Sequence, residues 1–156
     1  MKYILQKLFL GLLAIPMIFA SAAAYSSDKG SADEAVALVK KAAAYLSANG
    51  KEKAFAEFSN PAGQFVSKDL YVFVYNNEGI NLAHGANAKM IGKNLLELKD
   101  NEGVFIVKEF IKTANGKTGK GWIDYKWPNP VSKALEAKST YVEKVGDVII
   151  GCGIYK

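Results

Sequence analysis

The segment at residues 70–76, LYVFVYN, constrains the fold more than any other part of the chain. Its aromatic side chains alternate with aliphatic ones, and a period of two residues is typical of a β-strand. Because both sets are apolar, neither face of this strand can be left in water. The sequence therefore predicts a sheet with a covering layer on each face, which other segments of the chain must supply.

Helical patterns on either side of this strand can supply those layers. Residues 31–34, SADE, form a capping box, and apolar residues then recur at helical spacing until Asn49 and Gly50. A shorter helix is predicted over 51–58, before Pro61. After the strand, apolar residues at 107–114 predict another amphipathic helix. We expect the N-terminal helix to cover one face of the sheet and the later insert to cover the other.

Four more strands are expected, and the turns between most of them are short. They are predicted at 80–84, in WIDYKW at 122–127, at 138–145 and at 148–155. Sequential strands with short connections favour antiparallel pairing. The predicted class is α+β, with a five-stranded antiparallel sheet and a helical insert between the second and third strands. No repeat or linker divides the chain, so one domain is expected.

Residues 1–24 have the pattern of a secretory signal peptide. Lys2 and Lys7 precede an apolar run at 8–19, and small residues follow that permit cleavage after Ala22 or Ala24. The run is short for a spanning helix, which needs about 20 apolar residues, although a retained anchor is the alternative. We therefore predict a periplasmic protein whose mature domain covers 25–156, with no stable membrane span after cleavage.

The charged residues argue against nucleic acid as a partner. All 20 basic residues are lysines, against 15 acidic ones, and many lysines stand beside Asp or Glu. Without arginine the chain has no bidentate guanidinium for phosphate or guanine. The chain also has one histidine, His84, one cysteine, Cys152, and no recognisable catalytic motif. We expect no enzyme activity, no catalytic residues, no metal and no cofactor.

Aromatic residues at strand spacing are the most suggestive functional feature. Tyr75 lies on the aromatic face of the first strand, and Tyr125 and Trp127 share a face of WIDYKW. Such rings can wall a small pocket, and their polar atoms need partners when buried. The alternative is that the rings only fill the core. His84 ends the second strand, where it could donate to a bound carboxylate; the alternatives are that it is exposed to solvent or that it bonds a loop carbonyl.

Several ordered blocks carry a family resemblance. They are YVFVYNNEGINLAHG, GKN, GKGWIDYKWPNP and the terminal GCGIY. Together these blocks, within 32–155, resemble a single Cache domain of the second subtype, although Gly85 replaces the proline that often follows the histidine. The resemblance implies a PAS-like extracytoplasmic sensor for signal transduction, with a long N-terminal helix and a pocket beneath the insert. Such domains bind small molecules, often organic acids or amino acids.

On this basis we expect a small carboxylate or amino-acid ligand. The candidate ligand-binding residues are Tyr75, His84, Tyr125, Trp127 and Tyr141. No second membrane helix or output domain follows Tyr155, so a stand-alone module is expected to pass its signal to a membrane sensor or transporter. The alternative function is that of a structural or partner-binding envelope protein that has the fold and binds no ligand.

Overall fold

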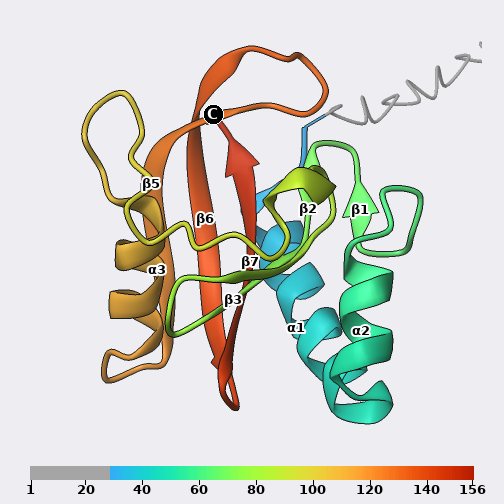
Figure 1. Ribbon diagram of the computed structural model, residues 1–156. Coiled ribbons are helices and arrows are strands. Elements are labelled where there is room, and N and C mark those ends of the chain that lie inside the picture. The colour runs from blue at the N-terminus through green and yellow to red at the C-terminus, as the bar shows by residue number, and fades with distance from the viewer. Residues whose placement is uncertain (1–28) are drawn as a thin grey trace, which may run out of the picture.

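The structure is a computed structural model that describes residues 29–156 (Figure 1). The predicted signal peptide at 1–24 lies outside the described residues, as do residues 25–28. Within 29–156, none of the helices has the length and apolar character needed to cross a membrane.

Two consecutive helices begin the domain, as the sequence predicts. Helix α1 (Ala32–Asn49) starts with the expected capping box, in which the Ser31 hydroxyl accepts from the Glu34 N–H at 3.2 Å. The Glu34 carboxylate in turn accepts from the Ser31 N–H at 2.7 Å. Gly50 has a φ of 75°, a region that favours glycine, and it turns the chain directly into α2 (Lys51–Phe58). Both helices are confirmed.

The main sheet has five antiparallel strands in the order β4-β3-β7-β6-β5. Their bounds are β3 (Phe73–Asn76), β4 (Asn81–His84), β5 (Lys120–Pro128), β6 (Leu135–Val145) and β7 (Val148–Tyr155). The last strand therefore lies in the centre, between β3 and β6. The five-stranded antiparallel sheet and the α+β class are confirmed.

The strand expected at 70–76 is divided in two. Its first part, β2 (Leu70–Tyr71), pairs with β1 (Val66–Ser67) in a separate ribbon. The division falls at Val72, whose N–H donates to the Phe65 carbonyl at 3.1 Å and whose carbonyl accepts from Gly85 at 2.9 Å. These bonds are made to residues outside the sheet, and nothing in the local alternation of side chains indicates them.

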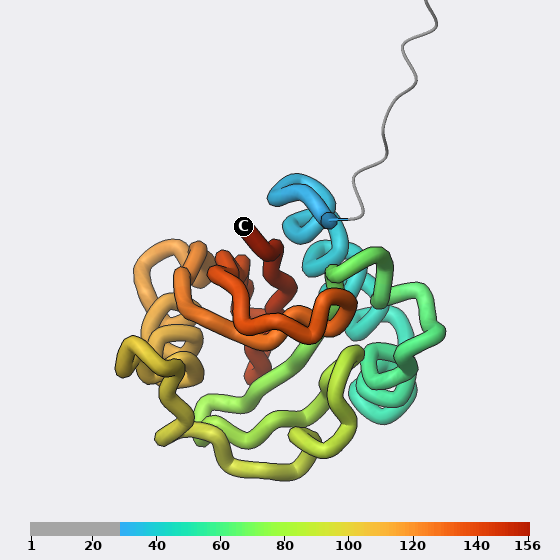
Figure 2. Tube along the Cα trace, turned by 90° about the horizontal axis from the view of Figure 1, so that it is seen from above, coloured from blue at the N-terminus to red at the C-terminus, as the bar shows by residue number. Residues whose placement is uncertain are grey.

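The two faces of the sheet are covered by different elements (Figures 1 and 2). On one face, α1 and α2 contribute residues such as Val39 and Phe58 to a core that includes Ile150. On the other face, α3 (Ile106–Ala114) packs Phe110 against a second core with Ile149. The insert that precedes α3 contains the short 3-10 helix η1 (Ala88–Met90). The expected double cover of the sheet is confirmed.

The two ends of the described chain lie close together. The Lys29 ammonium donates to the main-chain oxygen of Lys156 at 3.3 Å and pairs with Glu136 at 3.1 Å. Gly30 donates its N–H to the buried Asp69 carboxylate at 2.7 Å, and this bond holds the start of α1 against the turn between β1 and β2.

We expect Cys152 to resist thiol reagents in the folded protein. Its side chain is completely buried in the core beneath α1, and burial raises the pKa of the thiol to about 12. Because the thiolate is the nucleophile, both effects slow its reaction at neutral pH. Labelling with a chromogenic disulfide in native buffer and in urea measures this, since the chain has one cysteine. Equal rates in the two conditions would contradict the burial.

Candidate functional site

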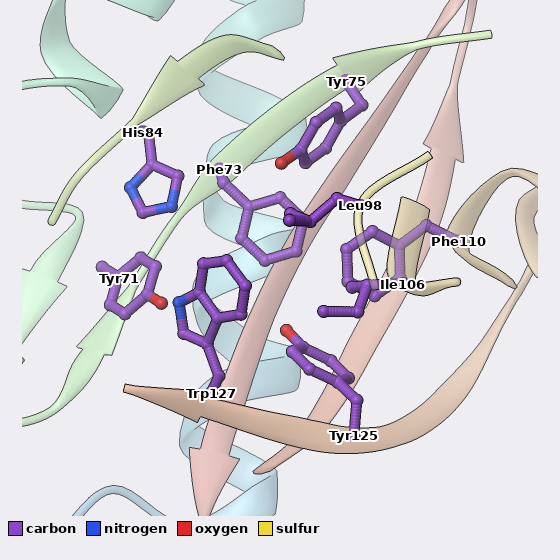
Figure 3. Close-up of a pocket in the computed structure, with 9 residues that line it drawn as sticks. All are labelled: Tyr71, Phe73, Tyr75, His84, Leu98, Ile106, Phe110, Tyr125 and Trp127. Carbon is purple, nitrogen blue, oxygen red and sulfur yellow. The ribbon is translucent and has the colours of Figure 1, made fainter. Parts of the chain in front are cut away.

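A small chamber lies between the sheet and the insert, on the face that α3 covers (Figure 3). Its volume is about 10 Å³, room for roughly one water molecule. Nine residues line it, and most are aromatic or aliphatic: Tyr71, Phe73, Tyr75, His84, Leu98, Ile106, Phe110, Tyr125 and Trp127. The chamber is therefore an apolar space with a few polar atoms at its edge.

A wider pocket of about 210 Å³ adjoins this chamber. It is walled by Ala86 and Asn87, by the end of β5 at Pro128, and by Asn129, Pro130 and Lys133 of the turn that joins β5 to β6. Both cavities are lined by Tyr71, His84 and Trp127, which we call the partition. The partition residues come from β2, β4 and β5, and Figure 3 shows their polar ends grouped together.

Two glycines of β7 make room on the sheet for the residues of this face. A Cβ atom at Gly151 would lie 2.3 Å from the ring of Phe73, and one at Gly153 would lie 2.2 Å from the Thr140 hydroxyl oxygen and 2.6 Å from Cε of Lys138. Real Cβ atoms do not approach so closely. The Gly-Cys-Gly sequence is therefore a structural requirement of the site, because it lets a ring and a lysine lie directly on the backbone.

His84 is a buried, neutral donor. Only 4% of the residue is exposed, and its Nδ1 accepts from the N–H groups of Ala86 at 3.3 Å and Asn87 at 3.0 Å. Burial, assisted by the charge of Lys138, lowers the pKa of the imidazole to about 3. The proton of the neutral ring is therefore on Nε2, which has no hydrogen-bond partner among residues 29–156. The alternative of an exposed histidine at the strand end is wrong.

Lys138 of β6 is the most unusual residue near the site. The residue is 1% exposed, and its Nζ donates to the hydroxyl oxygens of Tyr71 at 2.7 Å and Tyr155 at 3.2 Å. Nζ also lies 4.0 Å from the centroid of the Tyr71 ring. None of the salt bridges of residues 29–156 includes Lys138. Burial lowers the pKa of its amine to about 7.

This lysine orients the hydroxyl of Tyr71. The Tyr155 hydroxyl donates to the Pro128 carbonyl at 2.9 Å and accepts from Lys138, so its proton is already used. The Tyr71 oxygen also accepts from Lys138, so its proton is available for Tyr155, 3.3 Å away, or for an acceptor at the partition. Burial raises the pKa of Tyr71 well above its usual value, so this hydroxyl stays a donor.

The structure brings together four of the five residues proposed from the sequence. Tyr75, His84, Tyr125 and Trp127 all line the inner chamber. Tyr141 does not: it is aligned with Cys152 on β7 and lies in the core beneath α1. The expectation that it shares the site is corrected, because the pairing register turns its side chain to the opposite face of the sheet.

Sequence reasoning missed other residues of the site. Tyr71 and Phe73 lie on the same alternating face as Tyr75, so the strand pattern contained the signal for them. Phe110 lies on the apolar side of α3 and could be assigned only to the core. Lys138 carries no local signal, since it is one of 20 lysines, and its role depends on its register opposite Tyr125 and Tyr155.

Residues 13–156 match the model of the family described as Single Cache domain 2. A sensor histidine kinase of Rhizobium johnstonii, MctS, is 34% identical over 90 residues, which cover 56% of this chain and 19% of the kinase. The chain spans about a fifth or less of the length of the curated relatives it matches.

Solved structures have the same fold. A methyl-accepting chemotaxis protein of Vibrio parahaemolyticus superposes with a TM-score of 0.69 at 28% identity, over 79% of this chain and 86% of that one. A second structure, described as showing carboxylic acid recognition by a Cache chemosensory domain, has a TM-score of 0.67 at 23% identity. It covers 79% of this chain and 91% of that chain.

We predict that Lys138→Met raises the free energy of unfolding at pH 6, by about 1–4 kcal/mol. The folded pKa of about 7 lies below the unfolded value near 10.5, so below pH 7 the folded state holds a desolvated charge. Methionine removes this cost. The stability of the wild type increases as pH rises from 7 towards 10.5, so the advantage of the variant should shrink by pH 9.

Urea unfolding at both pH values measures this difference. Lys144→Met is the matched control, since Lys144 is an exposed lysine of the same strand. It should change the stability by less than about 0.5 kcal/mol at either pH. A Lys138→Met protein less stable than the wild type at pH 6 would show that the lysine stabilises the fold.

Proposed function

We propose that this chain, which belongs to the single Cache domain 2 family, binds a small carboxylate at the partition between its two cavities. Domains of this family are extracytoplasmic sensor domains, and the sensing role is the general part of the function. The ligand, the partner and the compartment are the parts that we propose.

The observation that carries the proposal is the set of donors at the partition. Tyr71 can offer an O–H and His84 an Nε2–H, the indole N–H of Trp127 is hydrogen-bonded to Tyr71, and the buried Lys138 amine donates to the Tyr71 oxygen. No aspartate or glutamate lines either cavity in the described part of the chain. Donors without competing acceptors are what an anion requires, and the site supplies them without an arginine.

The shape of the site favours an acid with a short apolar tail. The chamber behind the donors is walled by Phe73, Ile106 and Phe110, which offer no polar atom to a tail. An amino acid would need acceptors for its ammonium group, but the side-chain oxygens of Asn87 and Asn129 already accept main-chain N–H groups. We therefore rank a monocarboxylate above an amino acid, which remains the other candidate ligand.

A related solved structure is compatible with this choice. The Cache chemosensory domain described as recognising carboxylic acids has the same fold at 23% identity. The relative from Rhizobium is a sensor histidine kinase, of which this chain covers about a fifth. We propose by analogy that the domain reports its ligand to a membrane sensor or transporter.

A second candidate function is supported by the small size of the chamber. Phe73 and Phe110 stack with centroids 5.2 Å apart, and Tyr125 meets Phe110 edge-on at 5.6 Å. Rings packed in this way can serve a core alone, and the domain would then be a partner-binding envelope protein without a ligand. The absence of enzyme activity remains a prediction in both cases.

We expect a thermal-shift screen of formate, acetate, propionate and amino acids to stabilise the protein with at least one acid. Ligand at 100 times its Kd adds about 2.7 kcal/mol to the free energy of unfolding. Calorimetry with that acid should then show a loss of about 5- to 150-fold in affinity for Tyr71→Phe and for His84→Ala, because each removes a buried donor worth about 1–3 kcal/mol.

Tyr141→Phe is the matched control for this experiment. It removes a tyrosine hydroxyl from β6 of the main sheet, and that hydroxyl donates to Glu143 at 2.7 Å on the face opposite the cavities. Its affinity should equal that of the wild type. Equal losses in Tyr71→Phe and Tyr141→Phe would argue against the partition, and no stabilisation by any compound would favour the partner-binding function.

We also propose that the mature protein is periplasmic, on the strength of the apolar run and the small residues that follow it. N-terminal sequencing of the protein from a periplasmic extract should begin at Ala23 or Tyr25. An intact Met1 on membrane-bound protein would instead indicate a retained anchor.

A further inference from the structure

We propose that the site takes up one proton as it binds a carboxylate, and that Lys138 receives it. The inference rests on the proposed function, because it concerns the same partition. It follows from an uncommon arrangement: a fully buried lysine amine, without a salt bridge, that touches the cavity only through the hydroxyl of Tyr71.

Lys138 is the proton acceptor because the neighbouring titratable groups cannot take up the proton. They come from five different parts of the fold, and those that bear on its charge or titration are Asp69, Tyr71, His84, Tyr125, Cys152 and Tyr155. Burial raises the pKa values of the three tyrosines, so they stay protonated, and it does the same for Cys152 beneath the other face. His84 cannot take a proton on Nδ1 without breaking its two main-chain bonds.

Among residues 29–156, Asp69 is the carboxylate whose charge raises the pKa of Lys138. One of its oxygens accepts from the Gly30 N–H at 2.7 Å, and the other is buried and has no hydrogen-bond partner in the described part of the chain. It does not form an ion pair with the lysine. The free site thus has a lysine that can lose its proton near neutral pH, because burial opposes the charge more strongly than the two tyrosine hydroxyls and the charge of Asp69 compensate it.

A bound anion supplies the missing compensation. When the Tyr71 hydroxyl donates to a carboxylate and accepts from Lys138, the three groups form a chain of hydrogen bonds in which each strengthens the next. The negative charge favours the ammonium form, so binding and protonation support each other, and this coupling is reciprocal. Carboxylate plus proton is the composition of the neutral acid, so the site would respond to the product of acid anion and proton concentrations.

Calorimetry with acetate in HEPES and in Tris tests the proposal, since the buffers release protons with different heats. At pH 8.5 the difference between the binding enthalpies in the two buffers should correspond to the uptake of about one proton. At pH 6 it should correspond to almost none. The Kd should rise by nearly tenfold per pH unit above neutrality. If acetate does not bind, propionate is the second probe. Acid binding without proton uptake and with a constant Kd would overturn this inference and leave the proposed function intact.

Variants assign the proton to Lys138. Lys138→Arg keeps a permanent charge, so any binding should occur without proton uptake, and Lys138→Met should bind weakly with no uptake. Proton uptake that persists in either variant would assign it to another group. In the wild type, NMR of ¹³C-labelled lysine should show one signal whose titration midpoint lies near neutral pH. Acetate should shift this midpoint to higher pH. A failure of both acids to bind would overturn this inference and the proposed function together.

Discussion

The two central strands have apolar side chains on both faces, and the arrangement of the other elements follows from this. In β7 every residue except Ile154 is buried, and in β3 only Asn76 is partly exposed. Strands of this kind need a layer on each side. Helices α1 and α2 form one layer, while α3 and the preceding insert form the other. The cavity lies under the second layer, where a helix of nine residues and an irregular insert cover the strands.

Burying the polar groups of this second layer costs free energy of folding, because they are removed from water. The burial of the apolar cores must offset this cost. An amine and several hydroxyls are removed from water around Lys138, and the hydroxyls bond mainly to one another. A core built only for stability would have methionine or leucine at this position. The chain instead keeps a titratable group beside a cavity, which is characteristic of functional sites.

The sequence predicted the elements better than it predicted the site. The helices α1 and α2 and strand β7 begin and end where the caps, turns and glycines indicate. The ribbon of β1 and β2 was missed because two-residue strands are determined by distant partners. Alternation along one strand identifies which residues share a face, and it correctly grouped Tyr125 with Trp127. It does not show which residues of one strand lie on the same side of the sheet as those of another strand. For that reason Tyr141 was assigned to the wrong face and Lys138 was overlooked.

The proximity of the chain ends has a mechanical consequence. The Lys29 ammonium touches the last residue, so segments attached before residue 29 and after residue 156 would leave the domain at one point. Gly30, at the first of these ends, is held by Asp69, and Tyr155, at the second, contacts Lys138. Each end is therefore in contact with one of two buried groups, Asp69 and Lys138, of which the first raises the pKa of the second. Segments attached at the two exits would therefore begin next to each other, and each would adjoin a residue that contacts one of these two charged groups.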